Sequence, residues 1–234
     1  MSGRLASSKR FAALKLRAAT AALFLALLWP LSLSTPAAAQ DELIAAAERG
    51  EILVVRRLLA EGARVNARDV RGRTALLAAT HRNHVEVARM LINEGADVDA
   101  KDITQDTPFL LAGAEGRIDI LKLIVAAGPD LKSINRFGGT ALIPACHRGH
   151  VEAVKVLLAT AIDKDHINNL GWTALMEAVV LGDGGPRHTE IVRLLVAAGA
   201  DVNIPDRDGI TPFFHARQRG YHGIVGILQA AGAR

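Results

Sequence analysis

Residues 74–98 read TALLAATHRNHVEVARMLINEGADV, a stretch that opens on a threonine and closes on a glycine followed by Ala-Asp-Val. The opening phrase returns along the chain, three times at a spacing of 33 residues and once at 38. Its copies are Thr74-Ala-Leu-Leu, Thr107-Pro-Phe-Leu, Thr140-Ala-Leu-Ile, Thr173-Ala-Leu-Met and Thr211-Pro-Phe-Phe. A period in the range of about 20–50 residues is typical of arrays in which one small unit stacks on the next. The sequence therefore predicts a repeat protein.

The chemistry of one unit predicts two short helices and a turn. Thr74 can cap the first helix with its hydroxyl group, and Pro108 occupies a first helical position, where no N–H group is needed. A second helix is predicted from Val85 to about Asn93, because its apolar residues recur at helical spacing. Gly95 ends this helix, since a left-handed residue costs least as glycine. The unit is thus a turn followed by two antiparallel helices.

This unit resembles the ankyrin repeat, which has about 33 residues, a T-P-L-H opening and a G-A-D-V-N ending. Gly199-Ala-Asp-Val-Asn203 matches that ending letter for letter. The resemblance implies an all-α fold with β-turn tips, an ankyrin-repeat α-solenoid of about six stacked repeats over residues 41–234. The repeats are expected at 41–68, 69–101, 102–134, 135–167, 168–205 and 206–234.

Three departures from the pattern carry expectations of their own. Repeat 4 has Ala161 where glycine belongs, so Ala161→Gly is expected to stabilise the array. Repeat 5 carries an insertion at residues 182–187, interpreted as a longer turn between its helices or, alternatively, as a contact loop. Repeat 6 has Gly223 and Gly226 in its second helix and is expected to fray first.

Residues 1–39 have the features of a secretory signal peptide. They contain five Lys or Arg residues and no Asp or Glu, an apolar run over residues 18–29, and the small pair Ala37 and Ala39 at the end. We expect cleavage near Ala39 and a periplasmic or secreted protein without stable membrane insertion. The alternative is a membrane anchor left by an uncleaved signal, but the run is shorter than the roughly 20 residues of a spanning helix and Pro30 interrupts it.

Composition and charge exclude several other classes. Half of the residues are hydrophobic and 22% are charged, which excludes a disordered chain. The net charge of +4 comes from the first 39 residues, because the rest holds 23 Lys and Arg against 24 Asp and Glu. No nucleic-acid partner is therefore expected. The single cysteine, Cys146, permits no internal disulfide.

A cluster at Cys146, His147 and His150 suggests a metal site at first sight. By its place in the repeat, however, Cys146 should face the core, and His150 is the ordinary histidine of the turn before the second helix. Zinc needs ligand atoms about 2 Å from a single point, and these three residues are expected to face in different directions. We expect no metal, no cofactor and no catalytic residue.

The resemblance implies a non-enzymatic module that binds another protein through its turn tips and concave helix face. We expect the protein to be a monomer. The alternatives are a structural spacer or assembly scaffold, and an enzyme that uses the 182–187 insertion or Cys146, His147 and His150. The exposed positions of repeats 4 and 5 gather apolar residues flanked by arginine, as interface hot spots do. The candidate protein-binding residues are Arg136, Phe137, His147, Arg148, Leu170, Trp172, Val180, Leu181 and Arg219.

Overall fold

The computed structural model describes the backbone of residues 36–234 and the side chains from residue 40 onward, so the predicted signal peptide lies almost entirely outside it. Twelve helices and no strand form within these residues, which confirms the all-α prediction. The helices are α1 (Pro36–Arg49), α2 (Ile52–Ala60), α3 (Ala75–Arg82), α4 (Val85–Asn93), α5 (Pro108–Ala114), α6 (Ile118–Ala126), α7 (Leu142–His147), α8 (Val151–Leu158), α9 (Ala174–Val180), α10 (Pro186–Ala197), α11 (Pro212–Gln218) and α12 (His222–Ala230).

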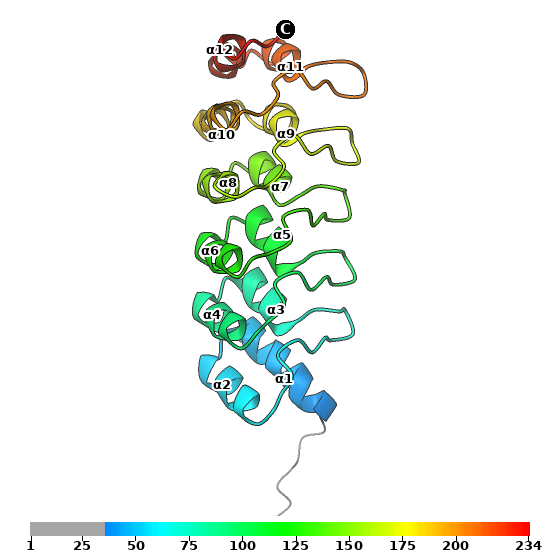
Figure 1. The fold of residues 1–234 in the computed structure, drawn as a ribbon, viewed down its shortest axis with the longest axis vertical. Coiled ribbons are helices and arrows are strands. Elements are labelled where there is room, and N and C mark those ends of the chain that lie inside the picture. Colours follow the sequence, from blue (N-terminus) through cyan, green and yellow to red (C-terminus); the bar gives the residue numbers. More distant parts are fainter. Residues whose placement is uncertain (1–35) are drawn as a thin grey trace, which may run out of the picture. The chain divides into compact units, whose positions relative to one another are not determined.

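Consecutive helices form six pairs, here called repeats 1 to 6, that stack into a solenoid (Figure 1). The first helices of the pairs pack on one another from α1 through α11, and the second helices do the same from α2 through α12. The loops between pairs project as tips on the side of the first helices (Figure 1). One face of the solenoid is therefore made by tips and first helices, and the other by second helices.

Each tip is a turn stabilised by its leading Asp or Asn. In repeat 2, Oδ1 of Asp69 accepts hydrogen bonds from the backbone N–H groups of Arg71 (2.8 Å) and Arg73 (2.9 Å). The same pair of contacts recurs at Asp102, Asn135, Asn168 and Asp206. The side chain thus satisfies the backbone groups that the turn leaves open, which explains why Asp or Asn occupies this position in each tip.

The predicted threonine caps form in three of the five repeats that have the motif. Oγ1 of Thr74, Thr107 and Thr173 accepts from the backbone N–H three residues on, at 3.2, 3.0 and 3.2 Å. Thr211 instead donates its hydroxyl hydrogen to the carbonyl of Arg234 at 3.1 Å. Thr140 makes no hydrogen bond through Oγ1 to any described residue, and its helix α7 begins one residue later than the others.

The positive φ on which the expectation for Ala161 depends is not found, because repeat 4 ends its second helix in a different way. Gly95 has a φ of +82°, and the next residue, Ala96, donates its N–H to the Leu91 carbonyl. Ala161 is not among the residues with positive φ. In repeat 4 the Thr160 hydroxyl donates to the Leu157 carbonyl at 2.6 Å and accepts from the Ile162 N–H at 3.2 Å. A side chain therefore bridges the two backbone groups that the glycine ending joins directly.

The insertion in repeat 5 lengthens both the turn and the following helix. Helix α10 has 12 residues, whereas α4 has 9, and Pro186 takes its first position. The ring of buried His188 fixes the turn, with Nδ1 2.7 Å from Oδ1 of Asp183 and Nε2 2.9 Å from the His147 carbonyl. The interpretation as a longer turn is thus right for residues 182–185, whereas residues 186 and 187 begin α10.

One position, directly before the second helix, makes a hydrogen-bond contact to the preceding repeat in repeats 2, 3 and 5. Nε2 of His84 lies 3.0 Å from the Glu48 carbonyl, and His188 makes the equivalent contact in repeat 5. In repeat 3 the same position is Arg117, which donates from Nη2 to the His81 carbonyl at 3.2 Å. Since His150 holds this position in repeat 4, its interpretation as a structural histidine fits the pattern.

The core runs without interruption from α1 to α12. Small residues such as Ala75 and Ala79 let the first helices approach closely, and Phe109 is among the largest fully buried side chains. Cys146 is fully buried, as predicted, and burial raises the pKa of its thiol. Cohesion along the array comes from contacts between neighbouring repeats, as expected for a solenoid.

Candidate protein-binding groove

A groove of about 340 Å³ lies between the tips and the first helices of repeats 3 to 5. We call it the central groove. Its lining residues come from three tips and from the helices α5, α7 and α9 or the residues directly after them. It is lined by Asp106, Leu111, Ala114, Glu115, Asn135, Arg136, Phe137, Gly139, Ile143, Pro144, His147, Arg148, Asn168, Leu170, Glu177 and Leu181.

Large apolar side chains stand exposed along this groove. Phe137 is 57% exposed, Leu170 51% and Leu181 43%. Phe137 and Leu170 hold the same position in neighbouring tips. The tips project from the helices, so these side chains lie outside the core. The guanidinium of Arg136 lies 4.6 Å from the centre of the Phe137 ring, a cation–π contact. Exposed apolar residues gathered in a hollow are typical of an interaction site.

Two arginines of the groove are paired with its own carboxylates. Nη1 of Arg148 forms an ion pair with Oε1 of Glu115 and also donates to the Ala114 carbonyl at 3.0 Å. Nη1 of Arg136 lies 3.8 Å from Oδ2 of Asp106. These contacts cross from one repeat to the next, so they fix the arginines at the rim of the groove.

Glu177 is the residue that the sequence analysis missed. It lies on α9 and is only 6% exposed, yet it lines the central groove. Its Oε1 accepts a hydrogen bond from Nδ2 of Asn168 at 2.8 Å, and its Oε2 lies 3.7 Å from Nδ1 of His147. Burial raises the pKa of its carboxyl group. A signal was present in the sequence, because repeats 2 to 4 have the uncharged residues Ala78, Leu111 and Pro144 at this position.

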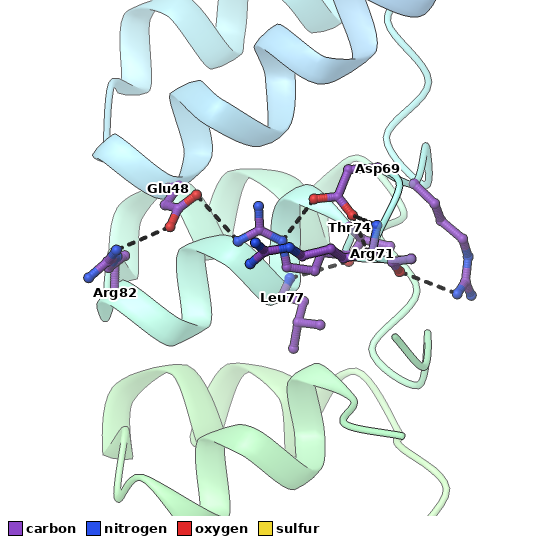
Figure 2. A network of polar contacts seen from close by, with 9 residues as sticks. Glu48, Asp69, Arg71, Thr74, Leu77 and Arg82 are labelled. Atoms are coloured by element: carbon purple, nitrogen blue, oxygen red, sulfur yellow. Dashed lines mark hydrogen bonds and ion pairs between the residues drawn. The ribbon is translucent and has the colours of Figure 1, made fainter. Parts of the chain in front are cut away.

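A second hollow of about 530 Å³ adjoins the central groove over repeats 1 to 3, and both are lined by Asp106 and Leu111. Figure 2 shows its polar network, in which Glu48 contacts Nη2 of Arg82 at 3.2 Å and Nη1 of Arg73 at 3.4 Å. Burial alone would raise the pKa of Glu48, but the hydrogen bond from Arg82 and the charges of Arg73 and Arg82 outweigh it and lower the pKa. The Glu48 carboxylate of this hollow is therefore already paired with two arginines of the protein itself.

The central groove brings together six of the nine predicted binding residues. They are Arg136, Phe137, His147, Arg148, Leu170 and Leu181. The other three lie elsewhere. Trp172 is half-buried in its tip, Val180 is half-buried at the end of α9, and Arg219 is exposed after the end of α11.

The side chains at Cys146, His147 and His150 do not converge. Cys146 is buried, His147 is exposed on the groove, and His150 packs against Gly116 of the preceding repeat. Within the described residues no group of three or more His, Cys, Asp or Glu side chains is arranged to hold a metal ion. In the same part of the chain, none of the helices has both the length and the apolar character needed to cross a membrane.

Comparison with known proteins agrees with this architecture. The family model "Ankyrin repeats (3 copies)" matches residues 34–102 and 109–206, more than half of the chain. The crystal structure of an ankyrin repeat domain from Acinetobacter baumannii is similar, with 51% sequence identity and a TM-score of 0.80 over 82% of this chain and 98% of that one. A second ankyrin repeat protein of known structure shows 40% identity and a TM-score of 0.78 over 81% of this chain and 97% of that one.

The ankyrin repeat protein YahD of Escherichia coli strain K12 is 47% identical over 57 residues. That match spans 24% of this chain and 28% of YahD. Repeat spacing, helix-pair stacking and these similarities agree, and the chain belongs to the ankyrin repeat family.

Proposed function

We propose that this protein is a non-enzymatic binding module that holds a partner protein in its central groove, outside the cytoplasm. Ankyrin repeats generally serve as protein–protein interaction modules, which supports the class of function. The fold is also typically non-enzymatic.

The observation that carries the proposal is the exposure of Phe137, Leu170 and Leu181 within one hollow. In a spacer or scaffold that binds no partner at this face, large apolar side chains would remain exposed to water, which is energetically unfavourable. Their exposure therefore favours a binding role over a spacer. Interface hot spots combine such anchors with arginine, and Arg136 and Arg148 stand beside them.

The test compares partner recovery with stability. Phe137→Ala and Leu170→Ala should each weaken recovery of the co-purifying partner, by about 2 kcal/mol of binding free energy for a hot spot. Since both side chains are more than half exposed, the melting temperature should stay close to that of the unchanged protein. Lys122→Ala, an exposed change on α6 away from the groove, is the matched control. Lost stability with unchanged recovery would contradict the proposal.

The location outside the cytoplasm rests on residues 1–39, with their basic start, apolar run and small-residue end. Among the side chains that the structure describes, the buried ones of α1 begin at Leu43, which lies after the expected cleavage site. Mass spectrometry of the mature protein should find Gln40 at the N-terminus, and a fusion of residues 1–45 to a reporter active only after export should be active. Protein that keeps residue 1 and stays in the membrane fraction would support an uncleaved anchor instead.

A further inference from the structure

Glu177 differs from the other carboxylates that line the central groove, Asp106 and Glu115, and from Glu48 of the neighbouring hollow. Glu48, Asp106 and Glu115 each have an arginine of this protein within 4 Å. Within residues 40–234, Glu177 forms no ion pair with a Lys or Arg; its one ion-pair contact within that distance is with His147. Glu177 is also buried, with an exposed fraction of only 6%.

His147 does not supply the missing positive charge. Its Nδ1 lies 3.7 Å from Oε2 of Glu177, beyond hydrogen-bond distance. Burial and the neighbouring Arg148 lower the pKa of the imidazole, so the ring is neutral at neutral pH. Only Asn168 donates a hydrogen bond to the carboxyl group among the described residues, and it does so to Oε1. Oε2 is left without a donor, at the floor of a groove.

A buried carboxylate without a cation is costly, and a cation that pairs with it recovers part of this cost. The protein offers none, whereas the groove gives access from outside and has apolar walls at Phe137 and Leu170. An anionic ligand would meet Glu177 itself, and the arginines that could attract it are engaged by Glu115 and Asp106. The charges thus favour a cationic occupant.

We propose that the central groove binds a partner segment that places a Lys or Arg side chain against Oε2 of Glu177 and an adjacent apolar side chain against Phe137 and Leu170. This inference rests on the proposed function and names the chemistry of the partner. Glu177 is then the residue that selects the bound segment, and the apolar walls supply the contact area.

The experiment selects peptides from a random dodecamer display library on the folded protein and on its Glu177→Gln variant. Glutamine keeps the size of the side chain and an oxygen that can accept from Asn168, so the fold should be retained. Peptides selected on the unchanged protein should be enriched in Lys or Arg next to an apolar residue. Their affinity should fall about tenfold or more in Glu177→Gln. Glu86→Gln, which removes the same charge from exposed α4, should leave it unchanged.

A change on the peptide gives a measurement that does not depend on the folding of a variant. Replacing the selected Lys by norleucine, or Arg by citrulline, should weaken binding to the unchanged protein and have little further effect on Glu177→Gln, as in a double-mutant cycle. Peptides that need Phe137 but carry no basic residue would overturn this inference and leave the proposed function standing. Peptides that bind equally well to Phe137→Ala and Leu170→Ala, or a selection without enrichment, would contradict both.

Discussion

A single hydroxyl group changes how the second helix of repeat 4 ends. Thr160 bridges the Leu157 carbonyl and the Ile162 N–H, and this bridge stands where repeat 2 uses Gly95. The sequence pattern pointed to glycine at 161 because the other repeats need positive φ there. A side chain one position earlier removed that need, and no repeat consensus records such a local alternative.

We predict that Thr160→Val destabilises the protein by about 1 kcal/mol, because the variant leaves two backbone groups without this partner. Ala161→Gly should now also destabilise it, by roughly 0.4–1 kcal/mol, since glycine adds freedom to the unfolded chain where no positive φ is required. Urea unfolding followed by circular dichroism measures both. A more stable Ala161→Gly would mean that repeat 4 can adopt the glycine ending after all.

The buried carboxyl group of Glu177 makes a second prediction at this scale. Burial raises its pKa in the folded protein, so the folded state gains stability as pH falls and the group takes up a proton. Glu177→Gln should therefore be more stable than the unchanged protein at pH 7.

Thermal melts of both proteins between pH 7.5 and pH 4.5 measure this difference. The advantage of Glu177→Gln should shrink as the pH is lowered through the raised pKa and towards the ordinary glutamate value. Asp106 also has a raised pKa through burial, but it is present in both proteins and cancels in the comparison. A constant difference across the range would show that Glu177 is not destabilised by its surroundings.

Helix α12 contains two residues of low helix propensity. Gly223 and Gly226 lie inside it, and neither has positive φ. A methyl group at Gly226 would meet nothing within 4 Å, and one at Gly223 would make ordinary contact with Thr189 at 3.5 Å. The glycines are therefore not required by the backbone or by close packing, and they only weaken the helix.

We predict that Gly226→Ala stabilises the protein by up to about 1 kcal/mol, through the difference in helix propensity and in the entropy of the unfolded chain. Hydrogen exchange of the α12 amides should slow by a corresponding factor. Gly95→Ala is the control: its site is equally open, but a φ of +82° should make alanine destabilising there. Faster exchange in α12 of Gly226→Ala would refute the interpretation.

The helices and turns show which features of the fold can be predicted from the sequence. The helix pairs, the Asp or Asn turns and the buried Cys146 follow from periodicity and turn chemistry, which depend on few neighbouring residues. The insertion was placed correctly, but its division between turn and helix depends on the buried ring of His188. That contact joins two repeats and has no signature in either one alone.

At the scale of the whole molecule, stacking decides which residues share a site. Counting free positions along the repeats predicted Phe137, Leu170 and Leu181, which line one groove. The same count also gave Trp172, Val180 and Arg219, which do not line the groove. Counting positions predicts which side chains are exposed, but it does not predict towards which part of the surface they point. Glu177 was not counted because it lies in the middle of a first helix, whereas the counted helical positions lie at the end of the first helices. Its place on the groove is visible only in the stacked structure.

The central claim is that the partner lies in the central groove. Replacing Phe137 by p-benzoylphenylalanine in living cells and irradiating them tests it directly, with the same replacement at Lys122 on α6 as the control. The account predicts a discrete covalent adduct at position 137 and none at 122, and the adduct at 137 should weaken when Glu177→Gln is added. An adduct at 122 alone, or equal adducts at both positions, would contradict the account.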